Sequence, residues 1–454
     1  MIKFVLIILI DILLLLYAPQ TMNKSFMSTV LLVAGATLFM FFSQCKDALG
    51  KIKLRHSVYF VICFSIVFFQ CNIDYVTSII DNSDAYLWIN EKYVPKSLAF
   101  SNIILACFCV GNISFTSAKM PNVTQNRVLN LNGKKYLANI VLLLLGVYLV
   151  LVPKEFLNYG YERGVDAGNA NLIMAYLQAG FIAMFTLYSM DYKQRDNITW
   201  VRFMKFPLII SLLYVVLVLV TGRRTEAIRI ASLIIIAYIY CKSGNVNYRR
   251  ILIFGILSLG AFSIIGVLRS LSSGSLQESA RIISEYTSVS PFTRELAGSV
   301  NTLHIAMANY PDPYEFNYGE TFIPSFFKII PGLTSFWGNY IVGHHVDGSN
   351  EIFTSIYFSG DKIWGLGSNI IADVYISFGI IGTCLVFFIF GRFVKYLEIK
   401  TFIIQSSPYI LALSFSSYSA FMFACRSTMA TIFLCWTYSC LLIYIFTRVA
   451  TNKS

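Results

Sequence analysis

The sequence predicts an all-α integral membrane protein with about 12 transmembrane helices, from its low charge, its hydropathy and its long apolar runs. Of the 454 residues, 57% are hydrophobic and only 13% are charged, and the mean hydropathy is +0.66. A soluble globular protein carries about 25% charged residues. Asp, Glu, Lys and Arg are absent from stretches such as 206–220, 251–268 and 408–425. The missing charge therefore reflects apolar runs of about the length that a bilayer requires.

Spans can be placed in order along the chain wherever an apolar run is long enough. The first run contains Asp11 and is not followed by a small-residue cleavage pattern, so we interpret it as a retained helix and not as a signal peptide. Asp11 is expected to form a hydrogen bond inside the bundle. The predicted spans are 2–18, 26–44, 57–73, 97–115, 137–153, 172–190, 206–221, 226–242, 251–268, 369–390, 407–425 and 427–446.

The loops between these spans differ in charge. Every loop that follows an even-numbered span is basic, whereas most of the other loops are acidic or balanced. Because basic loops stay on the cytoplasmic side, both termini are expected in the cytoplasm. The same bias accounts for the net charge of +12 without a nucleic acid partner. The basic residues after the sixth span are Lys193, Arg195, Arg202 and Lys205, and those after the tenth are Arg392, Lys395 and Lys400.

The cysteines give no sign of a disulfide framework or a metal site. All ten lie in or near apolar segments, and the hydrophilic stretch 269–367 contains none. No CxxC or Cys/His spacing suited to zinc occurs. No metal site is therefore expected, and no pattern in the sequence calls for a cofactor.

Three arginines at an outer boundary depart from the charge bias. Arg223 and Arg224 lie just before the N-terminus of the eighth span, and Arg229 lies within it. A helix N-terminus already carries partial positive charge, so cations there are unfavourable unless an anion shares the site. Arginines beside free backbone N–H groups suit a pyrophosphate. The alternative is that Glu226 and Arg229 form an (i, i+3) ion pair while the other two arginines contact lipid headgroups.

A large outer loop at 269–367, with short helices, separates an N-terminal bundle of about nine helices at 1–268 from about three C-terminal helices at 368–454. Structureless loops beyond about 15 residues are usually functional or disordered. This one is too aromatic to be disordered, especially over 310–340. Aromatic rings and carboxylates suit sugar binding, although an interfacial aromatic belt is the simpler explanation for any single ring.

Five short elements are spread over 220–390. They are Gly222-Arg-Arg-Thr-Glu226, Arg294-Glu295, Tyr318-Gly-Glu-Thr-Phe322, Lys328-Ile-Ile-Pro331 and the segment 367–379 that contains Asp373. In their order and their shared face, these elements resemble one group of Wzy-type O-antigen polymerases, while the rest of the chain is similar only in topology. Where that group often has Glu, this chain has the shorter Asp373.

The resemblance implies a glycosyltransferase of lipopolysaccharide biosynthesis that acts at the periplasmic face of the bacterial inner membrane. It would join oligosaccharide repeat units carried on undecaprenyl pyrophosphate, transferring the growing chain to the nonreducing end of a new unit. No nucleotide sugar would be needed, because the glycosyl–pyrophosphate bond is already activated. The implied partners are the lipid-linked oligosaccharide, membrane lipid, a chain-length regulator and other O-antigen assembly proteins.

Such a reaction needs cations for the leaving pyrophosphate and a base for the acceptor hydroxyl. Glu295 is the first choice of base, and the alternatives are Asp373, His304 and the pair His344-His345. Arg426 lies at a tight outer turn, where snorkelling to the interface is the alternative to a functional role. The residues assigned to catalysis are Glu295, Arg223, Arg224 and Asp373. Those assigned to substrate binding are Arg229, Arg294, Arg426, His344, His345 and Tyr318.

Two other functions fit parts of the pattern. An O-antigen ligase would use the same donor but deliver the chain to lipid A-core, and the order of the elements favours the polymerase. A lipid-linked oligosaccharide flippase or transporter would have internal repeats, short loops and ionisable residues deep in several spans. No clear repeat is present, and the charges cluster at outer boundaries.

Overall fold

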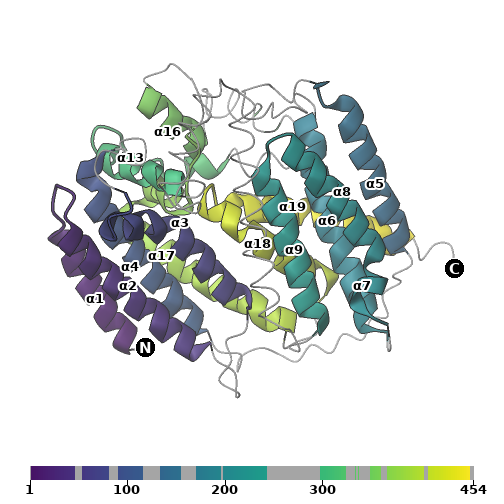
Figure 1. The fold of residues 1–454 in the computed structure, drawn as a ribbon, viewed down its shortest axis with the longest axis horizontal. Helices are drawn as coiled ribbons and strands as arrows, with labels where there is room; N and C mark the ends of the chain where they lie inside the picture. Colours follow the sequence, from purple (N-terminus) through teal and green to yellow (C-terminus); the bar gives the residue numbers. More distant parts are fainter. Residues whose placement is uncertain are drawn as a thin grey trace. The chain divides into compact units, whose positions relative to one another are not determined.

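The computed structural model describes most of the apolar part of the chain, and every regular element within the described residues is a helix (Figure 1). No strand occurs among them. The described residues are 2–45, 54–80, 90–115, 133–154, 170–195, 198–242, 297–323, 333, 336, 348–358, 366–402 and 407–449.

Each predicted span within these ranges is a helix, and 251–268 lies outside them. Eight helices are long and apolar enough to cross a membrane. They are α2 (Lys24–Gln44), α3 (His56–Val76), α4 (Val94–Ser114), α5 (Lys134–Leu151), α6 (Ala170–Lys193), α17 (Ile370–Phe402), α18 (Pro408–Cys425) and α19 (Ala430–Val449). By contrast, α1 (Ile2–Leu16) and α8 (Lys205–Val220) are short, and α9 (Arg224–Lys242) carries more charge. A count of about twelve spans and their orientation remain predictions.

The chain packs as two compact units, each made of discontinuous segments. Unit 1 comprises 1–118, 258–396 and 424–430, and unit 2 comprises 119–257, 397–423 and 431–454. The predicted division at 268 and 367 follows the order of spans along the chain, and it remains a prediction.

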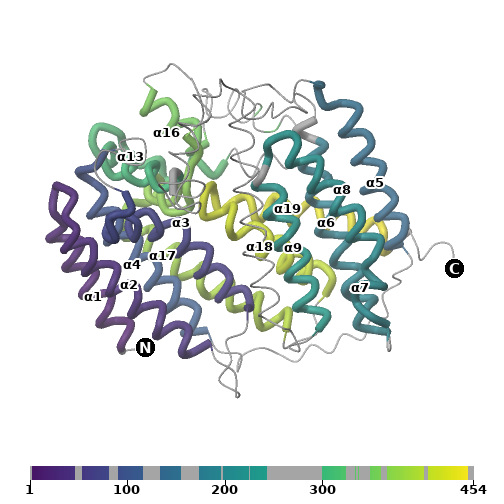
Figure 2. Tube along the Cα trace, in the orientation of Figure 1, coloured from purple at the N-terminus to yellow at the C-terminus, as the bar shows by residue number. Residues whose placement is uncertain are grey.

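Within unit 1, α4 and α17 cross in close contact (Figure 2). A Cβ on Gly391 would lie 2.2 Å from the carbonyl oxygen of Phe108, and one on Gly111 would lie 2.0 Å from that of Phe388. Small residues allow such contact between helix backbones, as in membrane proteins generally. Asn112 donates to the carbonyl of Gly391 at 3.1 Å. The two helices therefore have little freedom to shift at this crossing.

Unit 2 packs α5 against α6, and α8 and α9 against α6. The start of α5 is in close backbone contact with α19. A Cβ on Gly133 would lie 2.1 Å from the carbonyl oxygen of Phe446 in α19. Ser439 of α19 donates to the carbonyl of Ala179 in α6 at 3.1 Å. The buried ring of Phe181 meets that of Tyr214 with centroids 5.0 Å apart. Helices α5, α6, α8, α9 and α19 thus share one core.

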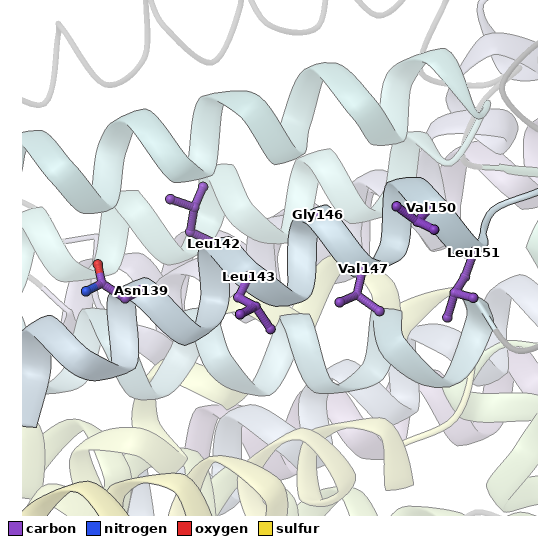
Figure 3. A pocket seen from close by; sticks show the side chains of 7 residues that line it. All are labelled: Asn139, Leu142, Leu143, Gly146, Val147, Val150 and Leu151. Atoms are coloured by element: carbon purple, nitrogen blue, oxygen red, sulfur yellow. The ribbon is translucent and has the colours of Figure 1, made fainter.

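The outer side of α5 is apolar and exposed (Figure 3). It forms a shallow hollow of about 610 Å³ whose lining comes from α5 alone, from Asn139 to Leu151. Leu143 is 63% exposed and Val150 83%. An apolar surface on one membrane-length helix, without convergent polar groups, fits contact with lipid acyl chains better than a substrate site.

Candidate functional site

The helix α17 is broken at Gly379, where φ is 66° and ψ is −168°. This region of backbone conformation is essentially restricted to glycine. Residues 370–378, which we name the half-helix, therefore have their own direction. A Cβ on Gly379 would also lie 3.1 Å from Cζ of Phe316. The break thus depends on glycine for its conformation and for the space that it leaves.

Asn369 holds the N-terminus of the half-helix. Its Oδ1 accepts hydrogen bonds from the backbone N–H groups of Ile371 at 3.1 Å and Ala372 at 2.8 Å. Its Nδ2 donates to the carbonyl of Ser299 and to Oγ1 of Thr302, both at 2.8 Å. An Asn in this position satisfies backbone donors that a helix start leaves open. Asn369 thereby ties the half-helix to α13 (Asn301–Asn309) and to the turn before it.

Asp373 lies in the half-helix and is fully buried. Neither carboxyl oxygen makes a hydrogen bond of ordinary geometry with a described residue. The hydroxyl groups of Thr321, Ser349 and Thr428 lie close to it, and they come from three separate segments of unit 1. Burying a polar group without a hydrogen bond is costly, so exceptions call for an explanation. In its ionised form, such a carboxylate can accept a proton from a hydroxyl group.

The loop segment 310–322 packs against the half-helix. The backbone N–H of Asn317 donates to the carbonyl of Ile376 at 2.9 Å, and the hydroxyls of Thr321 and Ser377 are 3.0 Å apart. Tyr318, one of the predicted substrate-binding residues, is 81% exposed at the tip of this segment with φ of 46°. Burial raises the pKa of Tyr310, at the start of the segment. That phenol stays neutral at physiological pH.

Arg426 belongs to the same unit as Asp373. It lies two residues before Thr428 in the turn between α18 and α19, and it is partly exposed. Because the Thr428 hydroxyl lies beside the Asp373 carboxyl, the turn that carries Arg426 adjoins the half-helix. Unit 1 thus gathers a carboxyl group, several hydroxyls and a cation from segments far apart in the sequence.

The predicted arginines at the start of α9 lie in unit 2. Gly222, with φ of 86°, precedes them and turns the chain from α8 into α9. Nη1 of Arg223 lies 2.7 Å from the sulfur of Met174. The side chain of Arg224 is outside the described part of the structure, although its backbone begins α9.

Arg229 is 6% exposed and is held in a buried polar cluster, which we name the Gln178 network: Gln178, Glu226, Arg229 and Cys435. Nη1 of Arg229 is 3.5 Å from Oε2 of Glu226, and Nη2 donates to the sulfur of Cys435 at 2.9 Å. Gln178 donates to Glu226 and lies 3.6 Å from the Cys435 sulfur. The (i, i+3) pair given above as an alternative is present. Gln178 and Cys435 are additional members that no sequence motif had indicated.

Several predicted site residues fall outside the described residues, namely Arg294, Glu295, His344 and His345. His304 is described and is buried in α13 of unit 1. Within the described part of the chain, no group of three or more His, Cys, Asp or Glu side chains is placed to hold a metal ion.

A comparison with protein families identifies the family of this chain. The model of the family described as O-antigen polysaccharide polymerase Wzy matches residues 1–454, the whole chain. The chain belongs to the Wzy family. No curated protein and no solved structure matches it. Membership in the Wzy family, together with the apolar helices, makes the chain a multi-pass bacterial membrane protein that polymerises O-antigen from a lipid-linked oligosaccharide. The resemblance noted in the sequence is thereby confirmed.

The Gln178 network makes a testable contribution to the stability of unit 2. In Glu226→Ala, Arg229 would keep its buried charge without its carboxylate partner, so we expect a loss of about 3 kcal/mol in folding free energy. The double variant Glu226→Gln/Arg229→Gln should recover part of the loss because it leaves no buried charge. Thermal melts of detergent-purified protein measure both. Glu91→Ala, at an exposed acid in unit 1, is the control. Equal losses in the single and double variants would contradict coupling between the two side chains.

Proposed function

We propose that the protein polymerises undecaprenyl-pyrophosphate-linked oligosaccharide repeat units into O-antigen polysaccharide at the periplasmic face of the inner membrane. The family match over the whole chain supports the polymerase activity. At the level of residues, the proposal depends on one observation. The buried Asp373 carboxyl group lies on a half-helix beside three hydroxyl groups and has no hydrogen bond of ordinary geometry with a described residue.

The donor side of the reaction requires positive charge at the pyrophosphate. We assign this role to Arg223 and Arg224 at the N-terminus of α9, where helix N–H groups and the helix dipole also favour an anion. Preorganised cations stabilise charge that develops as the leaving group departs. Arg229 has a partner in Glu226, so we assign it the task of holding the first turns of α9 in place. Its effect on substrate binding would then act through the two preceding arginines.

The acceptor side requires removal of a proton. In the proposed step, an acceptor hydroxyl gives its proton to a carboxylate while its oxygen attacks the anomeric carbon of the donor. The bond between that carbon and the pyrophosphate oxygen breaks, and undecaprenyl pyrophosphate leaves with the electron pair. Asp373 is the base favoured by its surroundings, and Glu295 is the base favoured by the family resemblance.

The remaining predicted residues are assigned to the sugars and to the charged part of the substrate. Tyr318 offers an exposed ring beside the half-helix, and rings of this kind pack against pyranose faces. Arg426 lies in the turn next to Asp373 and would bind an anionic group of the substrate. Arg294, His344 and His345 are proposed to contact the oligosaccharide from the large loop.

A complementation test distinguishes the polymerase from its alternatives. In a strain deleted for this gene, lipopolysaccharide should show lipid A-core with a single repeat, and the intact gene should restore the ladder on a gel. Arg223→Ala and Arg224→Ala, each present in the membrane at normal amounts, should lose the ladder. Comparison of Asp373→Asn with Glu295→Ala then shows which carboxyl group is the base, because the variant that lacks the base loses the ladder. Arg392→Ala, on the opposite predicted face, is the matched control and should keep it. If the deletion also removes the single-repeat band, the protein acts in export or ligation and the proposal is wrong.

A further inference from the structure

Unit 2 contains a second polar site, at the end of the unit where α5 begins and α6 ends. A pocket of about 420 Å³ there is lined by five cations. The cations come from the start of α5, the residues after α6, α7 (Trp200–Phe203) and the start of α8. They are Lys134, Lys135, Arg195, Arg202 and Lys205. The proposed polymerase mechanism uses none of these residues.

Only part of this positive charge is neutralised within the described structure. The carboxylate of Asp191 contacts the ammonium group of Lys134 and lies 3.2 Å from Nε of Arg195. No ion pair joins Lys135, Arg202 or Lys205 to another described residue, and all three side chains are exposed. Asp196, the other nearby acid in the sequence, lies outside the described residues. The pocket therefore suits an anionic ligand.

Aromatic rings fix the position of two of the cations. The ammonium group of Lys134 is 5.9 Å from the ring centroid of Phe203 and 6.0 Å from that of Tyr188. The guanidinium of Arg195 lies 5.4 Å from the ring centroid of Phe203. Cation–π contacts of this kind hold long side chains in place. Two of the five cations that line the pocket, Lys134 and Arg195, are thus held in position.

The pocket opens onto an apolar surface. Phe206 and Ile209 line it and are 39% and 46% exposed, and the same helix continues with Leu213, which is 51% exposed. On α5, Tyr136 is 64% exposed next to the paired lysines. A ligand that fills both regions needs an anionic head and apolar chains. A soluble phosphate or a nucleotide would leave the apolar part uncovered.

We propose that this pocket binds the phosphate headgroup of an anionic diacyl phospholipid, with its acyl chains along Phe206 and Ile209. Basic pockets between membrane helices on the cytoplasmic side are suited to such headgroups. The loop that follows α6 is predicted to be cytoplasmic, so the leaflet would be the inner one. The bound lipid would bridge the ends of α5, α6 and α8. This inference does not depend on the proposed polymerase mechanism.

The test measures lipid binding by the full-length protein in nanodiscs of phosphatidylcholine, with phosphatidylglycerol added as the probe and bound lipid read by native mass spectrometry. The intact protein should prefer phosphatidylglycerol to phosphatidylcholine. The triple variant Lys135→Gln/Arg202→Gln/Lys205→Gln should lose roughly a hundredfold in affinity, since each cation near an anionic lipid contributes about fivefold. The matched control Arg392→Gln/Lys395→Gln/Lys400→Gln removes the same charge on the same predicted face and should bind normally.

Further variants keep the result interpretable. Lys135→Arg/Lys205→Arg preserves the charge and should keep the affinity, and the elution and thermal melt of each variant establish that it is folded. An equal loss in the control triple would mean that binding follows overall charge, and the proposal would be wrong. It would also be wrong if undecaprenyl phosphate bound the pocket and phosphatidylglycerol failed to compete, because the site would then serve a polyprenyl carrier.

Discussion

Replacing Asp373 with Asn is expected to abolish the lipopolysaccharide ladder while the thermal stability of the protein stays the same or rises. The carboxyl group is buried and makes no hydrogen bond of ordinary geometry with a described residue. An amide of the same shape removes a group that is costly to bury as a charge. It also removes the proton acceptor, and general base catalysis contributes about 10²- to 10⁴-fold to a rate. Activity and stability should therefore change in opposite directions.

The opposite signs separate a catalytic role from a structural one. Ladder length on a gel reports activity, and a thermal melt of the purified protein reports stability. Asp11→Asn is the matched control, because Asp11 is equally buried but accepts a hydrogen bond from Asn102 at 2.7 Å. It should keep the ladder. Asp373→Glu retains a carboxyl group and should recover partial activity. A stable Asp373→Asn protein that still makes a ladder would transfer the role of base to Glu295.

The helices could be predicted from the sequence because the bilayer core contains no water to pair with the backbone. The N–H and C=O groups of an apolar run in the membrane must therefore form hydrogen bonds with each other, and a helix achieves this. The predicted span 206–221 corresponds to α8 at Lys205–Val220. The prediction for α17 stops at 390, whereas the helix continues to Phe402. Arg392, Lys395 and Lys400 ended the apolar run without ending the helix, since backbone hydrogen bonding does not require apolar side chains.

The break at Gly379 and the surroundings of Asp373 could not be predicted from local pattern. A single glycine inside an apolar run is compatible with a continuous membrane helix. The three hydroxyl groups near Asp373 come from residues 321, 349 and 428, and no spacing in the sequence links them. Gln178 could not be predicted as a site residue either, because no motif of the sequence contains it. Its partner Cys435 lies more than 250 residues away along the chain.

Gly379→Ala, at the break in α17, is expected to destabilise the protein and to abolish the lipopolysaccharide ladder. An alanine at φ of 66° and ψ of −168° would cost about 1–3 kcal/mol in backbone strain. Its Cβ would also lie 3.1 Å from Phe316. A backbone shift that relieves the strain or the contact with Phe316 would change the direction of the half-helix. It would thereby displace Asp373 from the hydroxyl groups around it. The loss of activity should therefore exceed what reduced stability alone explains.

Two further variants identify the cause of this effect. Gly146→Ala, in α5 with no atom within 4 Å of the added Cβ, should raise stability by about 0.5–1 kcal/mol, since alanine favours a helix interior. Gly379→Ala/Phe316→Ala removes the steric contact but keeps the backbone strain, so most of the loss should persist. Thermal melts and ladder length are measured for all three proteins at matched membrane expression. A Gly379→Ala protein with normal stability and a normal ladder would mean that residues 370–402 function as one continuous helix. The placement of Asp373 by the break would then be wrong.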